Sequence, residues 1–353
     1  MVRTTMTPPA SSGVVVGVDT HKDTHVARAK DALGRRLGEQ LVPTTPAGYR
    51  QLLAWARGLG EVAAFGVEGT GSYGAGLARY LRSEGEVVIE VIRPNRQARR
   101  RNGKSDPADA DAAASAVLSG DAAGLPKGAD GRVEMLRALR VARSTAVKAR
   151  TQAVNALKAL VVTAPSDLRE QLRASSTARL VYACARLRPG ELVDATAATK
   201  VALRSLATRS EALEAELERL NAALARLIGE AAPELVARFG VGPDSAGALL
   251  VAAGDNPGRL RSEAAFAMLC GASPIEASSG KIARHRLNRG GDRQANAALY
   301  HVVMSRAVGT GRPRTTWPDG PPKAGPSARL SAVSSAMSRA RSTSRSRACR
   351  RIG

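Results

Sequence analysis

The order of strand and helix signals over residues 13–120 constrains the fold of this 353-residue chain more than any other feature. Residues 13–18 are a β-branched run typical of a buried strand, and residues 25–30 and 37–42 can pair with it as a hairpin. A helix, a strand, a helix, a strand and an Ala-rich helix follow, expected at residues 45–59, 62–67, 74–84, 86–92 and 106–119. This order predicts an α/β domain with a mixed sheet over residues 13–125.

Two kinds of protein share this order of elements. It suits a ribonuclease-H-like (RuvC-like) domain, and actin-like sugar kinases begin in the same way. The order alone therefore leaves both folds open, and the side chains at the strand ends have to decide between them.

Acidic residues stand where the predicted strands end. Asp19 follows the first strand and Glu68 the fourth, whereas Asp106 and Asp109, three residues apart at a helix start, share one helix face. In a ribonuclease-H-like sheet the first and fourth strands are neighbours, so these carboxylates would converge. Clustered carboxylates repel one another, and proteins tolerate them mainly around a divalent cation. The pattern predicts a site for two Mg²⁺ ions that serve phosphodiester transfer.

Each carboxylate also has a purely structural explanation. Asp19 could be a turn or capping residue, and Asp106, which precedes a proline, could be the N-cap of its helix. A solvated helix face explains the nearby Asp111 better than a metal does. Glu68 is harder to explain as a cap, and the four positions together favour the metal site.

The charge of the chain indicates a polyanionic partner. Lys and Arg number 53 against 31 Asp and Glu, which gives a net charge of +22. Aromatic residues make up only 3%, so phosphate contacts should outweigh base stacking. One basic segment leads into Asp106 and another follows Ser279. The residues expected to contact nucleic acid are Lys22, Arg96, Arg99, Arg100, Arg101, Lys104, Lys281, Arg284, Arg286, Arg289 and Arg293.

The second half of the chain has a different character. Residues 131–230 predict long helices, interrupted at Pro165, that form a connector and a dimerisation arm. A coiled-coil-like seam runs through Leu213, Leu217, Leu220, Leu224 and Leu227. Residues 233–306 predict a small, mainly helical domain that begins with a glycine turn. Residues 1–12 and the Ser- and Arg-rich residues 307–353 are expected to be disordered.

Ser279 lies before a glycine and among five basic residues. Its hydroxyl could attack a phosphate whose developing charge the guanidinium groups would stabilise. The sequence offers no clear general base, since His285 is the only candidate nearby. A basic DNA-contacting loop whose serines only bind phosphate is the simpler alternative.

The three cysteines lie far apart, which fits neither a disulfide framework nor a zinc site and favours a reducing cytoplasm. No apolar stretch approaches the ~20 residues that span a bilayer, so no membrane partner is expected. The first residues lack the apolar segment of a secretory signal.

Several motifs, taken in order, resemble one known family. In the first domain they are GVDxxK at residues 17–22, EGTGSY at 68–73 and KSDxxDA at 104–110. In the second they are the Gly-Val-Gly turn at 240–242 and SSG followed by GDR over 278–293. Together they resemble the DEDD insertion-sequence transposases (the IS one-ten group), over about residues 13–306.

This resemblance implies a RuvC-like domain, a coiled-coil arm and a C-terminal transposase domain. It places Asp19, Glu68, Asp106 and Asp109 as metal ligands and Ser279 as the nucleophile that links covalently to DNA, with Ser278 as the alternative. It further implies an oligomer, dimeric or tetrameric, that a bridge RNA guides to element ends and target DNA. In such an oligomer the metal site of one subunit works beside the serine of another.

The chain departs from the family pattern after Arg306. Such transposases continue into further basic helices, whereas this sequence becomes rich in Ser, Arg and Pro, as if read in a shifted frame. We hypothesise that the usual C-terminal helices are missing and that this copy folds incompletely and is inactive.

Three other functions remain as alternatives at this point. A RuvC-like nuclease or junction resolvase would cut with metal alone and never form a protein–DNA adduct. A sugar or acetate kinase would have no place for the basic loop and the Asp106/Asp109 pair. A non-catalytic remnant would retain nucleic acid with no chemistry.

Overall fold

A computed structural model describes residues 13–91, 105–122, 124–129, 131–173, 176–256, 259–260, 262–278 and 284–309. The chain divides into two compact units. The first unit contains Met1–Glu134 and, from much later in the chain, Ala253–Phe266. The second contains Met135–Ala252 and Ala267–Gly353. The return of residues 253–266 to the first unit was not expected from the sequence.

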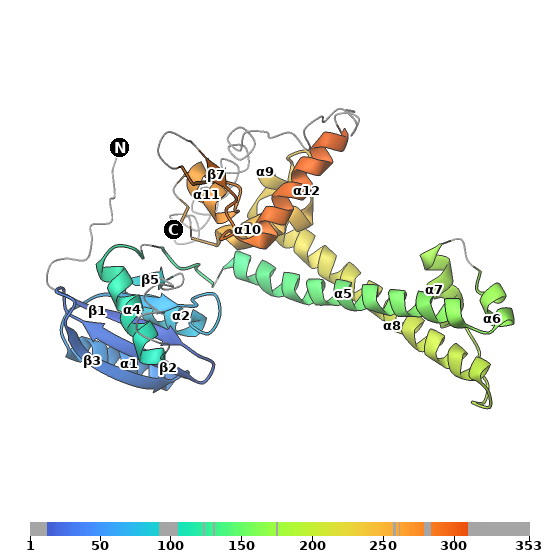
Figure 1. The fold of residues 1–353 in the computed structure, drawn as a ribbon, viewed down its shortest axis with the longest axis horizontal. Coiled ribbons are helices and arrows are strands. Elements are labelled where there is room, and N and C mark those ends of the chain that lie inside the picture. Colours follow the sequence, from blue (N-terminus) through green and yellow to red (C-terminus); the bar gives the residue numbers. More distant parts are fainter. Residues whose placement is uncertain are drawn as a thin grey trace, which may run out of the picture. The chain divides into compact units, whose positions relative to one another are not determined.

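The first unit is built on one five-stranded mixed sheet (Figure 1). Its strands are β1 (Val14–Thr20), β2 (Thr24–Lys30), β3 (Arg36–Pro43), β4 (Val62–Glu68) and β5 (Val88–Val91), in the order β3-β2-β1-β4-β5. The first three pair antiparallel, whereas β1–β4 and β4–β5 pair parallel. The predicted mixed sheet, with the first and fourth strands adjacent, is confirmed.

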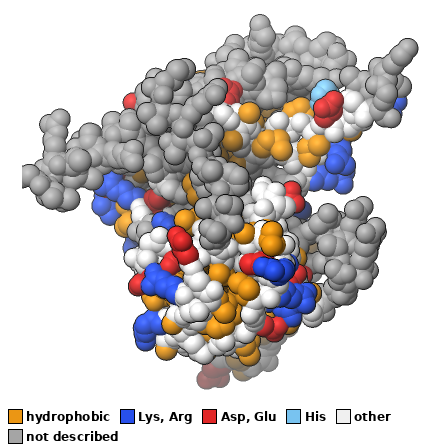
Figure 2. All heavy atoms as spheres, turned by 90° about the vertical axis from the view of Figure 1, so that its left-hand side faces the viewer, with side chains coloured by type: hydrophobic (Ala, Val, Ile, Leu, Met, Phe, Trp, Pro, Cys, Tyr) orange, Lys and Arg blue, Asp and Glu red, His pale blue; other side chains and the backbone are white. Residues whose placement is uncertain are grey.

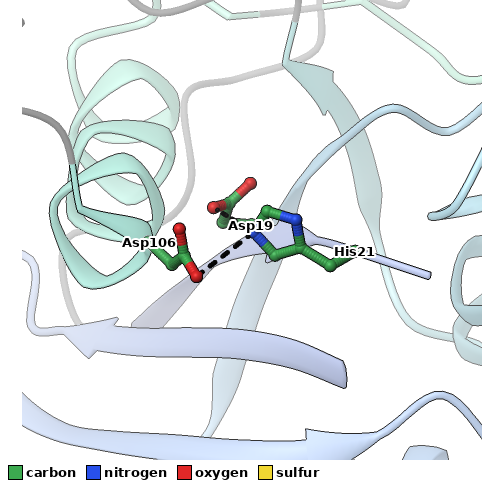
Figure 3. Close-up of side chains that lie close together, drawn as sticks. All are labelled: Asp19, His21 and Asp106. Carbon is green, nitrogen blue, oxygen red and sulfur yellow. Dashed lines mark hydrogen bonds and ion pairs between the residues drawn. The ribbon is translucent and has the colours of Figure 1, made fainter. Parts of the chain in front are cut away.

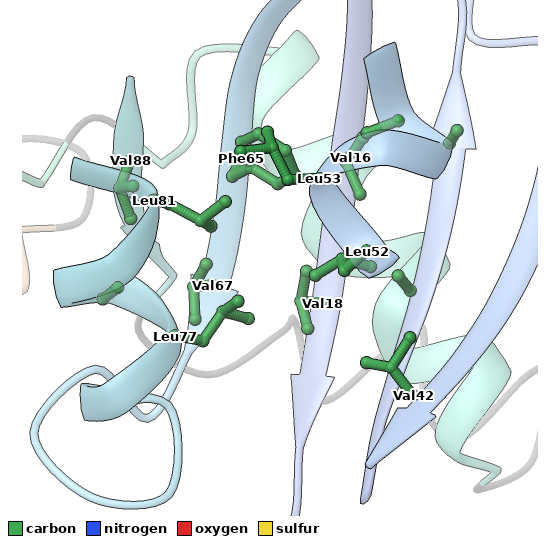
Figure 4. Close-up of a cluster of buried hydrophobic side chains, with 14 of the residues drawn as sticks. Val16, Val18, Val42, Leu52, Leu53, Phe65, Val67, Leu77, Leu81 and Val88 are labelled. Carbon is green, nitrogen blue, oxygen red and sulfur yellow. The ribbon is translucent and has the colours of Figure 1, made fainter. Parts of the chain in front are cut away.

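Helices cover both faces of this sheet. On one face α1 (Pro46–Gly58) and α2 (Ala75–Ser83) pack through leucines on strand residues such as Val16, Val18 and Val67 (Figure 4). The Thr45 hydroxyl caps α1 by accepting a hydrogen bond from the Gly48 amide at 3.1 Å. On the other face α4 (Asp106–Leu118) packs on alternate strand residues, such as Val15.

Helix α4 lies unusually close to β1, because Gly17 has no side chain. A Cβ atom at Gly17 would stand 2.0 Å from the Ala110 carbonyl oxygen and 2.3 Å from the Ala114 amide nitrogen. The helix turns that meet the sheet also carry small residues, Ala110, Ala113 and Ala114, all of them fully buried. Backbone therefore packs on backbone here, and this contact sets the depth at which the start of α4 meets the end of β1.

Asp111 anchors the outer side of α4 to the sheet, in place of the solvated position expected from the sequence. Its carboxylate accepts hydrogen bonds from Lys30 Nζ and Arg36 Nε, both at 2.8 Å, and its side chain is only 18% exposed. Burial opposes ionisation of Asp111, but the bonds from Lys30 and Arg36 outweigh it and lower the pKa of this carboxyl.

Asp111→Asn is expected to reduce the free energy of unfolding by about 2 kcal/mol at neutral pH, because it leaves the buried Lys30 charge without its partner. A lowered carboxyl pKa stabilises the fold above the ordinary value of 3.8 and loses that effect as the pH falls through the folded value. The deficit of the variant should therefore shrink in acid, as measured by urea unfolding at pH 7 and near pH 2.5. Glu39→Gln, which removes the partly exposed pair with Arg28, is the control. A deficit that is unchanged in acid would contradict this role.

The second unit contains a long helical hairpin. Its arms are α5 (Arg132–Thr163), which starts in the first unit, and α8 (Ala195–Ala231), and between them lie α6 (Ser166–Gln171) and α7 (Thr177–Ala185). Three contacts along the arms show that they run antiparallel. Arg143 donates to Asn221 at 2.6 Å and Arg150 pairs with Glu214. Further along α5, Leu157 shares a core with Leu203, which comes earlier on α8. The predicted leucine seam lies on α8, with Leu217, Leu224 and Leu227 buried. Because Glu214 and Asn221 share that helix face, the seam packs on α5 of the same chain.

The rest of the second unit is mainly helical, as expected, with one small hairpin that the sequence did not indicate. Its elements are α9 (Pro233–Val236), α10 (Pro243–Ala253), the end of α11 (Glu263–Leu269, which begins in the first unit), β6 (Ile275–Glu276), β7 (His285–Arg286) and α12 (Arg293–Gly309). Helix α12 extends three residues past the predicted end of the domain, and residues 310–353 lie outside the described part. Among the helices described, none combines the length and apolar character that crossing a membrane requires.

The start of α5 is held by residues that come about 120 positions later. The Asp255 carboxylate accepts a hydrogen bond from the Val133 amide at 2.9 Å, in the first turn of this 32-residue helix. The Asn256 side chain donates to the Pro126 carbonyl at 2.8 Å and accepts from the Gly128 amide at 3.3 Å. The linker before α5 thus receives hydrogen bonds from the returning segment 253–266 in addition to those that Arg79 and Arg82 of α2 donate to its carbonyl groups.

Candidate functional site

Two of the predicted metal ligands meet beside a histidine at one end of the sheet (Figure 3). The His21 Nε2 atom lies 3.1 Å from Asp19 Oδ2 and 3.4 Å from Asp106 Oδ2. The potential ligand atoms of the three residues all lie within 4.8 Å of one another. Asp19 leaves the end of β1 with a side chain 10% exposed, whereas the Asp106 side chain is 53% exposed. The cluster is therefore buried on one side and open on the other.

The first turn of α4 supplies two of these carboxylates. Ser105 is the N-cap residue, so Asp106 is not the cap but the first residue of the helix. Asp109 follows one turn later on the same face and is buried, 5% exposed. Burial raises the pKa of the Asp19 carboxyl, the nearby His21 works against this rise, and the Asp109 and Asp106 carboxylates add to it. Asp19, Asp106 and Asp109 thus form one electrostatic group.

The register of the sheet places Glu68 level with Asp19. Val18 of β1 pairs with Val67 of β4, so Asp19 and Glu68 stand level on neighbouring parallel strands. Both valines face the core under α1 and α2, and the next residue on each strand therefore points to the α4 face. Beyond the Val18–Val67 pair, the Thr20 hydroxyl donates a hydrogen bond to the Glu68 carbonyl at 3.0 Å and ties the ends of β1 and β4 together.

His21 is the member of the cluster that sequence reasoning missed. It stands two residues after Asp19, where the extended chain returns to the same side, and imidazole is a common metal ligand. An Asp-x-His pattern at a strand end was the available signal, although such a pattern is weak on its own.

Ser278 lies just after β6 in the small hairpin that β6 and β7 form. The Ser278 hydroxyl accepts a hydrogen bond from the Arg284 amide at 3.2 Å, and Ala277 donates to the Arg284 carbonyl at 2.8 Å. Ser279 and Lys281 lie outside the described residues. His285 pairs with Glu276 across the hairpin and is exposed.

Four predicted nucleic-acid contacts of this segment are exposed side chains. They are Arg284, Arg286, Arg289 and Arg293. Arg293 is the first residue of α12, and Arg289 lies four residues before it. The Asp292 carboxylate caps this helix through the Gln294 and Ala295 amides, and the Asp292 amide donates to the Leu269 carbonyl at 2.7 Å.

The basic residues expected near the carboxylates are only partly described. Lys22 is exposed in the turn after β1. The positions of Arg96, Arg99, Arg100, Arg101 and Lys104 lie outside the described residues. Figure 2 shows basic and acidic side chains interspersed on the face that it draws.

The mixed sheet, with carboxylates at the ends of β1 and β4 and at the start of α4, defines a ribonuclease-H-like domain. Comparison with protein-family models then gives the family. A DEDD transposase model matches residues 16–164, and the model of the transposase IS116/IS110/IS902 family matches residues 234–316. A search of curated proteins gave no match. The chain belongs to the IS110 family of transposases, which are DNA-binding, phosphoryl-transfer enzymes.

These matches decide between two of the sequence alternatives. The family excludes the actin-like sugar kinase that shares the order of elements. The second match continues to residue 316, so the resemblance extends ten residues past Arg306, where the departure from the family pattern was expected to begin. The DEDD family typically uses divalent metals, in keeping with the cluster of Asp19, His21 and Asp106.

Proposed function

We propose that this transposase cuts and rejoins DNA with Mg²⁺ held by Asp19, Glu68, Asp106 and Asp109 and with Ser279 as the nucleophile. The observation that carries the proposal is the approach of carboxylates from two distant segments, Asp19 at a strand end and Asp106 at a helix start. Only packing of α4 on β1 brings them together, and it does so against their mutual repulsion.

The residues present suit a divalent cation. Carboxylate oxygens are the ligands that Mg²⁺ prefers, and one open side leaves room for substrate phosphates. Mg²⁺ bound there would polarise a phosphodiester oxygen and favour an ionised attacking or leaving oxygen. The protein contributes a buried wall on the Asp19 and Asp109 side and an exposed edge at Asp106, so a phosphate approaches from the open edge.

The two adjacent serines are given different roles. Ser278 uses its hydroxyl as an acceptor that closes the hairpin, and this supports Ser279 as the nucleophile. In the proposed step the Ser279 oxygen forms an ester bond with phosphorus while the bond to the leaving DNA oxygen breaks, and that oxygen takes up the serine proton. A DNA hydroxyl reverses the exchange in rejoining, so no external energy source is needed. Exposed arginines such as Arg284 and Arg286 would hold the phosphate.

The proposed partners are the element ends and target DNA, a structured guide RNA and further copies of the chain. The net charge of +22 supports polyanionic partners. The oligomer, a dimer or tetramer in which the carboxylates of one subunit act beside the serine of another, rests on the family resemblance. We further propose that the protein works in the cytoplasm, beside the nucleoid.

Ser279→Ala is expected to abolish both strand exchange and the covalent protein–DNA adduct, because the neighbouring Ser278 hydroxyl is already bonded to the Arg284 amide. Denaturing electrophoresis of protein incubated with labelled element-end DNA, guide RNA and Mg²⁺ measures the adduct. Ser278→Ala is the matched control and should still form it. Cleavage that survives Ser279→Ala without an adduct would favour a metal-only nuclease, and nucleic-acid retention without chemistry in every form would favour an inactive remnant.

A further inference from the structure

A chain of three buried polar side chains links the returning segment 253–266 to the loop that follows Glu68. The Thr70 hydroxyl donates to Glu90 Oε1 at 2.7 Å, and Glu90 Oε2 lies 3.5 Å from Arg259 Nη2. Thr70 is 5% exposed, and the side chains of Glu90 and Arg259 are 19% and 11% exposed. The interaction is therefore largely shielded from water, where ionic hydrogen bonds are strongest.

Arg259 fixes the far end of this chain. Its Nε atom donates to the Leu125 carbonyl at 3.1 Å and its Nη1 atom to the Ala253 carbonyl at 3.2 Å. The Glu90 amide donates to the Gly124 carbonyl at 2.7 Å, so the linker after α4 is held on the same residue. A planar guanidinium that bonds in three directions has little freedom to move. Glu90 thus presents its carboxylate to Thr70 in a fixed orientation.

At the opposite end of this series of side chains, Thr70 lies in the sharp turn that directly follows Glu68. Gly69 has φ of +60°, and its carbonyl accepts the Ser72 and Gly74 amides at 2.8 and 3.1 Å. Thr20 holds the Glu68 carbonyl from the β1 side. The Thr70 hydroxyl holds the turn from the other side, through its bond to Glu90 of β5. The Glu68 backbone is therefore tied to β1 through the Thr20 hydroxyl, and the turn that follows it is tied to β5 through the bond from Thr70 to Glu90.

We propose that Thr70, Glu90 and Arg259 form a positioning relay that orients Glu68 for divalent metal binding, so that the metal site depends on the docked segment 253–266. This inference rests on the proposed function, because it requires Glu68 to be a metal ligand. None of the three residues touches the metal or the reacting atoms. They act through Glu68, by setting the position of its turn.

A purely structural role would give a different result, and this makes the relay testable. Burying an Arg–Glu pair and a threonine could serve only to join the segment 253–266 to the sheet. In that case removal of the Thr70 hydroxyl would lower stability and leave metal affinity unchanged. Under the relay, Thr70→Val weakens metal binding even though valine has nearly the same shape and fills the same buried position.

The test measures Mn²⁺ binding to the purified full-length protein by calorimetry, with thermal unfolding recorded in parallel. Thr70→Val and Arg259→Ala should each weaken Mn²⁺ binding by about tenfold, as for partners that orient a ligand. The double variant should be no weaker than either single one, because the two residues act in series. Thr70→Ser, which keeps the hydroxyl, should bind like the unmodified protein. Arg57→Ala should do so too, since it removes another Arg–Glu pair of this unit, 2.7 Å from Glu86.

Each outcome bears on one of the two proposals. Normal Mn²⁺ affinity in Thr70→Val and Arg259→Ala, with binding lost in Asp19→Asn, would overturn the relay and leave the metal site standing. Weakening in Arg259→Ala alone would also overturn it, since Arg259 would then act without Thr70. If Arg259→Ala does not fold, Thr70→Val decides alone. Binding that is unaffected by Asp19→Asn would overturn the proposed metal site, and the relay with it.

Discussion

Asp19→Asn is expected to reduce Mg²⁺-dependent strand exchange by at least about a thousandfold, which corresponds to about 4 kcal/mol of transition-state stabilisation. Asparagine keeps the shape of the side chain but removes a buried negative charge that lies beside Asp106 and Asp109. Strand exchange on DNA carrying an element end and a target site, measured against Mg²⁺ concentration, gives the effect. Glu68→Gln should give a loss of the same order.

The stability of the same variant separates catalysis from folding. Without metal, Asp19→Asn should be at least as stable as the unmodified protein, because a buried charge that faces two like charges has gone. Asp23→Asn, which alters an exposed carboxylate in the turn after β1, is the matched control and should exchange strands normally. Strand exchange within a few-fold of normal in Asp19→Asn would be incompatible with the proposed metal site.

Gly17→Ala is expected to have the largest effect on stability, a loss of about 3 kcal/mol or more in the free energy of unfolding. The added methyl group would stand 2.0 Å from the Ala110 carbonyl oxygen, so α4 has to move off the sheet. This movement would carry Asp106 and Asp109 away from Asp19, so strand exchange should be lost as well. Urea unfolding and the strand-exchange assay measure the two losses.

Gly58→Ala provides the matched glycine substitution in the same unit. Gly58 is the exposed last residue of α1, with open space where a Cβ would lie, so alanine there should be neutral or more stable by about 0.5 kcal/mol. If Gly17→Ala unfolded at the same urea concentration as Gly58→Ala, the close packing of α4 on β1 would be wrong.

The parts of the fold that the sequence predicted are those governed by local patterns. Continuous apolar runs end at Asp19 and Glu68 and so place them at strand ends, and a three-residue spacing puts Asp106 and Asp109 on one helix face. The ribonuclease-H-like fold then predicts β1 beside β4, and the strand order confirms this. Together these rules predicted the candidate site before any contact was known.

The parts that the sequence did not predict depend on contacts between distant residues. Nothing local marks Asp255 and Arg259 as partners of Val133 and Glu90, because hydrogen bonds between irregular segments have no period. Asp111 was misjudged for the same reason, since its partners Lys30 and Arg36 come from strands about 80 residues earlier. The hairpin around Ser278 was missed because its two strands have two residues each, too few for an alternating pattern.

The capping of α5 by Asp255 has a consequence for biosynthesis. When translation has reached residue 134, the five-stranded sheet and α4 have been synthesised. Asp255, which caps the Val133 amide, and Arg259, which pairs with Glu90, are added only after more than a hundred further codons. The nascent N-terminal domain therefore emerges without the cap on α5 and without the Arg259 partner of Glu90, and both contacts can form only after most of the second unit has been synthesised.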